Sequence, residues 1–152
     1  MIIYKQGCAI AALESGEINI LAHGVNAKGA MNSGIAKLIR QAYPEVYTKY
    51  KNLYDEGGIS LGVCQTVVLS KRKVVANLVT QQSYGRDTKR YVNYGAISMA
   101  LHRLFFLAQY NGYVVGMPRI GAGLGGGSWL IISELVEFYA NHFNVEVRVY
   151  EI

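Results

Sequence analysis

This chain of 152 residues has few cysteines, few histidines and no long apolar run, and each shortage excludes a class of protein. Cys8 and Cys64 are too few for a disulfide framework, so we expect a reducing, cytoplasmic location. No apolar stretch reaches the length of a membrane span, and no basic region precedes a hydrophobic one at the N-terminus. We therefore expect no contact with a membrane and no signal peptide. His, Cys, Asp and Glu do not cluster at ligand spacing, so we expect no metal and no cofactor.

Acidic residues are also scarce, with 10 Asp and Glu against 15 Lys and Arg. The net charge of +5 suits an anionic small molecule, but the bases are scattered, so nucleic acid is an unlikely partner. The hydrophobic fraction of 51% fits a globular protein, and the length fits a single domain over residues 1–152. We see no repeat or linker, and take a monomer as the default.

The most distinctive stretch is MPRIGAGLGGGSW, residues 117–129. An apolar run precedes it and a helical pattern follows it, so we expect a loop between a strand and a helix. Its five glycines can bring backbone N–H groups close to a ligand, and the next helix adds its positive end. These features predict a phosphate-binding loop, and the alternative is a flexible surface turn. No Lys-Ser/Thr pair follows the glycines, so it is not a P-loop.

Hydrophobic periodicity predicts alternating strands and helices along the rest of the chain. The expected strands are residues 2–5, 18–25, 61–69, 73–79, 113–117 and 145–150. The expected helices are residues 34–42, 91–110 and 129–140, with another from Pro44 that ends at Gly57-Gly58. Residues 8–13 read as a loop or a single helical turn. This order indicates an α/β fold with a mixed sheet, in which the loops after His23, Val79 and Met117 meet at one edge.

Three stretches in these loops carry a family resemblance. They read HGVNAKGAMNSGIA at 23–36, NLVTQ at 77–81 with Tyr91 beyond it, and the glycine loop at 117–129. Together they resemble a macrodomain, the ADP-ribose-binding module, and in particular the branch with ADP-ribose-1''-phosphate phosphatases and terminal ADP-ribose protein glycohydrolases. The resemblance implies a three-layer α/β/α sandwich with a mixed, mostly parallel sheet of about six strands. The first loop would hold the distal ribose, and the glycine loop the diphosphate.

The resemblance also implies which residues contact the ligand. These would be Gly7, Cys8, Ala9, Ile10, Asn26, Ser33, Gly34, Ile35, Ala36, Thr80, Gln81, Pro118, Arg119, Ile120, Gly121, Ala122, Gly123, Leu124, Gly125, Gly126 and Gly127.

This sequence departs from the family pattern at four places. Cys8 stands where an Asp usually accepts a hydrogen bond from the adenine amino group, so adenine selectivity is open. Gln81 or Gln82 stands where the glycohydrolases have a Lys, and Gly125 stands where they have an Asp. Without that amine and carboxylate, the glycohydrolase route through a lysine adduct is disfavoured. Asn32 replaces a usual Gly, and Asn tolerates positive φ.

Three residues are candidates for catalysis, each with a structural alternative. His23 could protonate a leaving ribose oxygen or orient water, or it could be a structural histidine. Asn26 could donate to a ribose hydroxyl or a phosphate, or it could form a turn. Asp87 could position water, or it could be a solvated loop residue. Lys28 and Arg86 could compensate the ligand's charge.

Two functions of different classes remain open at this stage. The first is binding of ADP-ribose or a derivative with metal-free hydrolysis of ADP-ribose 1''-phosphate. The second is a non-catalytic reader or scavenger of ADP-ribose or a related nucleotide. An ADP-ribosyl hydrolase with different catalytic residues is a further alternative.

Overall fold

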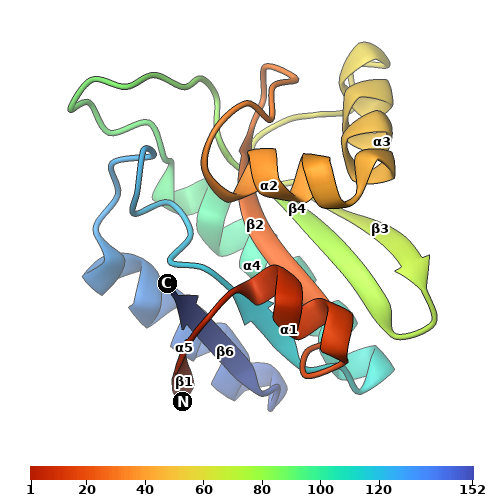
Figure 1. Cartoon of the computed structure of the whole chain (residues 1–152). Helices are drawn as coiled ribbons and strands as arrows, with labels where there is room; N and C mark the ends of the chain where they lie inside the picture. Colours follow the sequence, from red (N-terminus) through yellow and green to blue (C-terminus); the bar gives the residue numbers. More distant parts are fainter.

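The computed structural model describes residues 1–152 and arranges them as one six-stranded sheet with five helices (Figure 1). The strands are β1 (Ile2–Gln6), β2 (Ile20–Asn26), β3 (Cys64–Ser70), β4 (Lys73–Gln81), β5 (Val115–Met117) and β6 (Val147–Glu151). The helices are α1 (Ala9–Ser15), α2 (Gly34–Ala42), α3 (Pro44–Asp55), α4 (Tyr94–Asn111) and α5 (Trp129–Phe143). No helix combines the length and the apolar character that crossing a membrane requires.

The strands lie in the order β1-β6-β5-β2-β4-β3. All neighbours pair in parallel except β3, which pairs antiparallel with β4 through the expected hairpin. The predicted mixed, mostly parallel sheet of about six strands is therefore confirmed. The central strands β2 and β4 are buried along nearly their whole length, as parallel strands covered on both faces should be.

Two hydrophobic clusters fill the two faces of the sheet. Alternate residues of β2 show the division, because Ile20 and Ala22 join one cluster while Leu21 and Val25 join the other. Helices α4 and α5 pack on the first face, and α1, α2 and α3 cover the second. Figure 1 shows α1 and α2 in front of the sheet and α4 and α5 behind it. This is the three-layer α/β/α sandwich that the resemblance implied.

Side-chain caps fix the starts of α4 and α5, of which periodicity placed the second correctly at Trp129 and the first only approximately. The predicted helix over residues 91–110 begins instead at Tyr94, because Val92 bridges Gln81 and the Asn93 side chain accepts from Ala96 N–H (2.9 Å). In the same way Ser128 accepts from Ile131 N–H at the start of α5.

Residues 8–13, expected to form a loop or a single turn, lie mostly in a helix of seven residues. α1 buries Ala9, Ala12 and Leu13 against the second face, which stabilises a helix too short to persist alone. Gly16 ends it in the left-handed conformation (φ 81°).

The order of connections opens a crevice at the carboxyl edge of the sheet. β2 and β5 are parallel neighbours, but β2 continues into α2 on one face and β5 continues into α5 on the other. The two loops therefore separate as they leave the sheet. A crevice at such a point is where ligands bind in open α/β sheets.

Candidate functional site

A cavity of about 480 Å³ occupies this crevice. It is lined by the end of β2 (24–26), the segment leading into α2 (30–36), the end of β4 (80–81), residues 84–86, and the glycine loop (118–121 and 123–125). The three loops that the sequence predicted to meet at one edge do line one cavity.

The first turn of α2 presents free backbone donors to this cavity. Its N-cap Ser33 is extended and makes no capping bond with its side chain. The N–H groups of Gly34, Ile35 and Ala36 have no acceptor within the protein. All four residues line the cavity. The positive end of the helix is therefore open to an anion.

The glycine loop is folded on itself by its own hydrogen bonds. Gly127 N–H donates to the Gly121 carbonyl (2.7 Å), and Gly126 N–H donates to the Gly123 carbonyl (3.0 Å). The Gly125 carbonyl in turn accepts from Tyr91 N–H (2.8 Å) and from Val92 N–H (3.1 Å). The loop is thus tied to the segment before α4, so it is not a free surface turn.

These bonds leave a second set of unused donors at the cavity. The N–H groups of Gly121, Gly123, Leu124 and Gly125 have no acceptor within the protein, and all four residues line the cavity. With the first turn of α2, they form a concave surface rich in N–H groups. Such a surface suits a phosphate or diphosphate.

Glycine is required at Gly125 for space. A Cβ atom there would lie 2.7 Å from Val92 Cγ1 and 2.9 Å from the Gly121 carbonyl oxygen. At Gly123 a Cβ atom would meet nothing within 4 Å. The two glycines therefore differ: Gly125 is packed into the fold, whereas Gly123 is open to the cavity.

Arginines are the only charged side chains that line the cavity. Arg119 is paired, since its Nε donates to Glu151 (2.8 Å) and its guanidinium lies near the rings of Tyr4 and Trp129. Arg86 makes no hydrogen bond or ion pair within the protein. No carboxylate or histidine is among the lining residues. The local charge therefore favours an anionic ligand.

Asn26, the predicted catalytic residue that does line the cavity, is largely occupied in building its own turn. Its Oδ1 accepts from Lys28 N–H (2.9 Å) and from the Tyr50 hydroxyl (3.0 Å). Its Nδ2 donates to the Ala30 carbonyl (2.9 Å). The turn alternative raised for Asn26 thus describes most of its contacts.

Thr80 differs from Asn26 because its side chain makes no hydrogen bond within the protein. It lines the cavity and is 1% exposed, yet its Oγ1 has no hydrogen-bond partner in the protein. A buried hydroxyl without a partner is costly, so a ligand atom that bonds to it would remove the cost.

His23 does not reach the cavity. β2 extends three residues beyond it, and the alternation of the strand turns its ring to the face covered by α1, α2 and α3, where it is fully buried. Its Nε2 lies 2.6 Å from Asn77 Oδ1. Burial lowers the pKa of His23 to about 4, so the imidazole is neutral near pH 7. The expectation that it ends its strand at the ligand edge was wrong.

Asp87 also lies outside the cavity lining. Its Oδ1 accepts from the Tyr91 hydroxyl (2.8 Å) and from Lys89 N–H (3.1 Å), so it organises its own exposed loop. Its carboxylate therefore has partners of its own.

The cavity includes fourteen of the residues implied as ligand contacts. These are Asn26, Ser33, Gly34, Ile35, Ala36, Thr80, Gln81, Pro118, Arg119, Ile120, Gly121, Gly123, Leu124 and Gly125. It does not include Gly7, Cys8, Ala9, Ile10, Ala122, Gly126 or Gly127. Their role in binding stays a prediction.

Eight lining residues were not among those predictions: Gly24, Val25, Ala30, Met31, Asn32, Tyr84, Gly85 and Arg86. Gly24 and Val25 lie at the end of β2, and Ala30, Met31 and Asn32 lie in the loop that follows it, so all five flank predicted positions. The others come from the polar loop after β4, where Arg86 had been noted only as a possible counter-charge. No three or more His, Cys, Asp and Glu side chains gather as metal ligands.

Two curated relatives match almost all of this chain. The ADP-ribose 1''-phosphate phosphatase of Candida albicans is 28% identical, over 97% of this chain and 99% of its own length. The DNA ADP-ribosyl glycohydrolase of Mycobacterium tuberculosis is 27% identical over 99% of this chain. The chain spans only 42% of that relative's length.

The fold also has a solved counterpart. The structure of Thermosipho africanus DarTG in complex with ADP-ribose matches 97% of this chain and 41% of that one, with a TM-score of 0.78 at 19% identity. At that identity the likeness shows the fold alone. The family model of the Macro domain matches residues 22–135, which include the whole cavity lining. The chain therefore belongs to the macrodomain family.

Proposed function

We propose that this protein binds ADP-ribose or a close derivative in the cavity at the carboxyl edge of the sheet. The observation that carries the proposal is the pair of unused N–H sets, from the first turn of α2 and from the glycine loop, that line one cavity. A diphosphate between them would accept from both sets at once. Arg86 would add a positive charge, and the ADP-ribose derivatives named for the Candida and Mycobacterium relatives support this ligand class.

Calorimetry with ADP-ribose, with and without a chelator, tests this binding. We expect measurable affinity that the chelator leaves unchanged, because the donors are backbone and arginine N–H groups. ADP should bind and adenosine should bind far more weakly, since adenosine lacks the diphosphate. No heat of binding at millimolar ADP-ribose would reject the proposal.

A second candidate is metal-free hydrolysis of ADP-ribose 1''-phosphate. The end-to-end match with the Candida phosphatase favours it. The water oxygen would bond to phosphorus as the bond between phosphorus and the ribose O1'' breaks, and one water proton would pass to O1'', so that ADP-ribose and inorganic phosphate leave. Free N–H groups at Gly121, Gly123 and Leu124 would stabilise charge that develops on the phosphoryl oxygens. Asn26 could align the water with the one Nδ2 hydrogen that its turn leaves unused.

The lining residues favour the alternative of a reader without catalysis. No carboxylate or imidazole lines the cavity, so general acid–base catalysis would need the loop of Asp87 to move. Incubation with ADP-ribose 1''-phosphate and an assay for free phosphate separates the two. If the protein binds ADP-ribose 1''-phosphate but releases no phosphate, it acts as a non-catalytic reader. Release of ADP-ribose from an ADP-ribosylated DNA substrate would instead extend the activity named for the Mycobacterium relative to this chain.

A further inference from the structure

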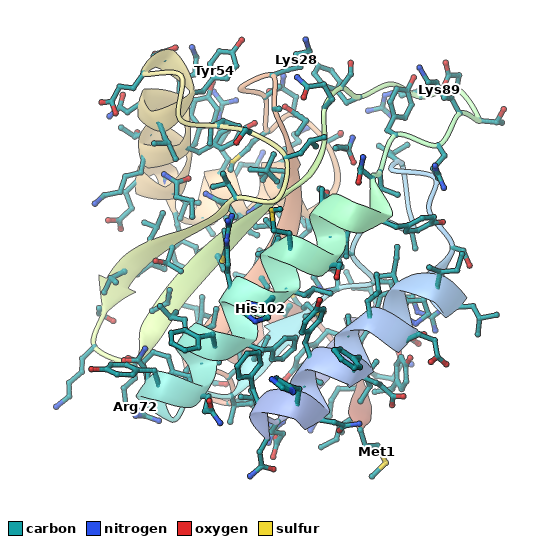
Figure 2. The ribbon with its side chains drawn as sticks, turned by 180° about the vertical axis from the view of Figure 1, so that it is seen from behind. Met1, Lys28, Tyr54, Arg72, Lys89 and His102 are labelled. Atoms are coloured by element: carbon teal, nitrogen blue, oxygen red, sulfur yellow. The ribbon has the colours of Figure 1, made fainter.

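Helices α4 and α5 leave an apolar face uncovered on the outside of the sandwich. Six large hydrophobic side chains of these two helices are exposed: Met99, Phe106, Tyr110, Leu130, Ile131 and Phe138. Two of them are aromatic rings more than half exposed, Phe106 at 56% and Phe138 at 62%. Figure 2 shows this side of the molecule, with His102 between the two helices.

The aromatic side chains along this face form one continuous surface. His102 packs edge-on against Tyr139 (5.7 Å between ring centroids) and against Phe143 (5.2 Å). Phe106 reaches the same Phe143 ring (6.1 Å) from α4. Phe138 contacts Tyr139 (5.1 Å), so the rings link the two helices without a gap. The exposed rings are therefore held at fixed positions and are not scattered along mobile side chains.

Charge is unusually low on these helices. Only Arg103, Glu134 and Glu137 are charged in α4 and α5 together. Arg103 donates to the Gly62 carbonyl (2.8 Å) and Glu137 accepts from Ile2 N–H (3.2 Å), so both are already engaged. By contrast, the shorter helices α2 and α3 carry six charged side chains. The core of a homodimer interface has this depletion of charge and this content of aromatic rings.

We propose that this face, defined as the outer surface of α4 and α5 around Phe106 and Phe138, is a two-fold interface between two copies of this chain. A two-fold axis places the same patch on both sides, so an apolar, nearly uncharged surface is its own complement. Each copy carries a net charge of +5 and repels the other. The repulsion is least where the two copies meet without cationic side chains.

The available area is adequate for such a contact. A large aromatic side chain buries roughly 150–250 Å², so Phe106, Tyr110 and Phe138, all more than half exposed, offer on the order of 400 Å² per copy. Monomers seldom expose a larger apolar patch than this. The polar rim, with His142 and Gln109, adds to this area toward the ~800 Å² per partner of a standard interface. The cavity opens at the carboxyl edge of the sheet, so this contact leaves it accessible.

Sedimentation equilibrium on the whole chain tests the interface. At about 200 μM, a standard-sized interface of micromolar affinity gives a species of twice the 16.8 kDa chain mass. Phe106→Glu with Phe138→Glu should raise the dissociation constant roughly 100-fold or more, because both are aromatic rings more than half exposed on the proposed interface. Val68→Glu is the matched control, since Val68 is 65% exposed on β3 at the sheet edge.

The outcomes divide cleanly. A monomer at 200 μM overturns the proposal, and so does a dimer that survives the double variant or is lost in Val68→Glu. Thermal melts confirm that each variant is folded. If the double Glu variant unfolds, Phe106→Ser and Phe138→Ser, which add no charge, serve instead. Both should weaken association while leaving ADP-ribose binding unchanged.

Discussion

His23 Nε2 lies 2.6 Å from Asn77 Oδ1, on parallel neighbouring strands and inside the protein. Asn77 Nδ2 donates to Gln65 Oε1 (3.0 Å), and Gln65 Nε2 donates to the Lys49 carbonyl (3.1 Å). Because Asn77 uses its amide hydrogens toward Gln65, its oxygen faces His23, which must then carry its proton on Nε2. This chain of bonds joins β2, β4 and β3 to α3 and leaves His23 Nδ1 without a partner.

The first prediction concerns stability at acid pH. The pKa of His23 is about 4 in the folded protein and 6.5 in an unfolded chain, so the unfolded state binds a proton first. The stabilising contribution of the neutral His23 to the free energy of unfolding is therefore complete above pH 6.5 and is lost as the pH drops toward 4. The loss is on the order of 3 kcal/mol, from about 1.4 kcal/mol per pH unit. Urea unfolding between pH 7 and 4.5 measures it.

His23→Gln is the control for this prediction, because a glutamine amide can bond to Asn77 but does not titrate. The pKa values of Glu14 and Glu17 are lowered by hydrogen bonds to Tyr43 and Lys5, so these groups reduce stability only below their ordinary value of 4.5. Above pH 4.5, the free energy of unfolding of the wild type should fall more steeply with decreasing pH than that of His23→Gln. Equal slopes would show that His23 does not titrate with a pKa of about 4.

The second prediction separates structure from catalysis at the same residue. His23→Ala should lower stability by about 2–4 kcal/mol, because it opens a buried cavity and leaves Asn77 without its donor. If the protein releases phosphate from ADP-ribose 1''-phosphate, kcat should fall much less than the roughly 100-fold expected for an acid–base group. Thermal melts and phosphate-release kinetics give the two numbers. A 100-fold loss of kcat at unchanged stability would show that His23 acts in catalysis.

Much of the fold follows from hydrophobic periodicity, because strands covered on both faces have apolar residues throughout and helices repeat them every three to four positions. What periodicity cannot assign is the direction of one polar side chain in a buried strand. His23 looks like the end of an apolar run, but β2 continues to Asn26, and the pleat turns the ring away from the edge. The full length of α1 was not predicted either. A helix of seven residues is too short to give a periodic signal, and α1 is stabilised by tertiary burial of Leu13.

The sequence predicted which loops form the cavity and fourteen of its lining residues, but it did not distinguish the roles of individual residues within a loop. Gly121, Gly123 and Gly125 have equal status in the sequence, but the structure separates packed from open glycines. Tyr84 and Gly85 come from a polar loop with no periodic signal, so nothing in the sequence places them over the cavity. Their position is set by the bonds of Asp87 and by the docking of Tyr91 and Val92 on Gly125.

The third prediction tests the unpartnered hydroxyl at Thr80. Thr80→Val keeps the shape of the side chain and removes a buried group whose missing bond costs about 1 kcal/mol or more, so the free protein should become more stable. If the hydroxyl bonds to the ligand, affinity for ADP-ribose should fall about fivefold at the same time, by the usual conversion. Urea unfolding and calorimetry measure the two effects. A loss of stability would mean that the hydroxyl has a partner in the free protein.

The fourth prediction compares two glycines of the loop. Gly125→Ala should destabilise the protein by about 1–3 kcal/mol, because the new methyl group meets Val92 and the Gly121 carbonyl. Gly123→Ala should stay within about 0.5 kcal/mol of the wild type, since nothing lies near its Cβ position. Thermal melts decide. Equal effects at both positions would mean that the loop does not pack on Val92 as described.

The last prediction uses Gly123 to test where the phosphates lie. Gly123→Glu should remove most ADP-ribose binding without unfolding the protein, because the position is open and its free N–H lines the cavity. A carboxylate about 4 Å from a phosphate adds roughly 4 kcal/mol of repulsion at an effective dielectric near 20. Solvent at the cavity mouth screens part of this repulsion, so we expect a loss of about 100-fold in affinity.

The control is Gly123→Gln, which has almost the same shape without the charge, so its affinity for ADP-ribose should fall about tenfold at most. Calorimetry on both variants, with melts to confirm folding, separates repulsion from crowding. If a folded Gly123→Glu binds ADP-ribose like the wild type, the glycine loop does not hold its diphosphate.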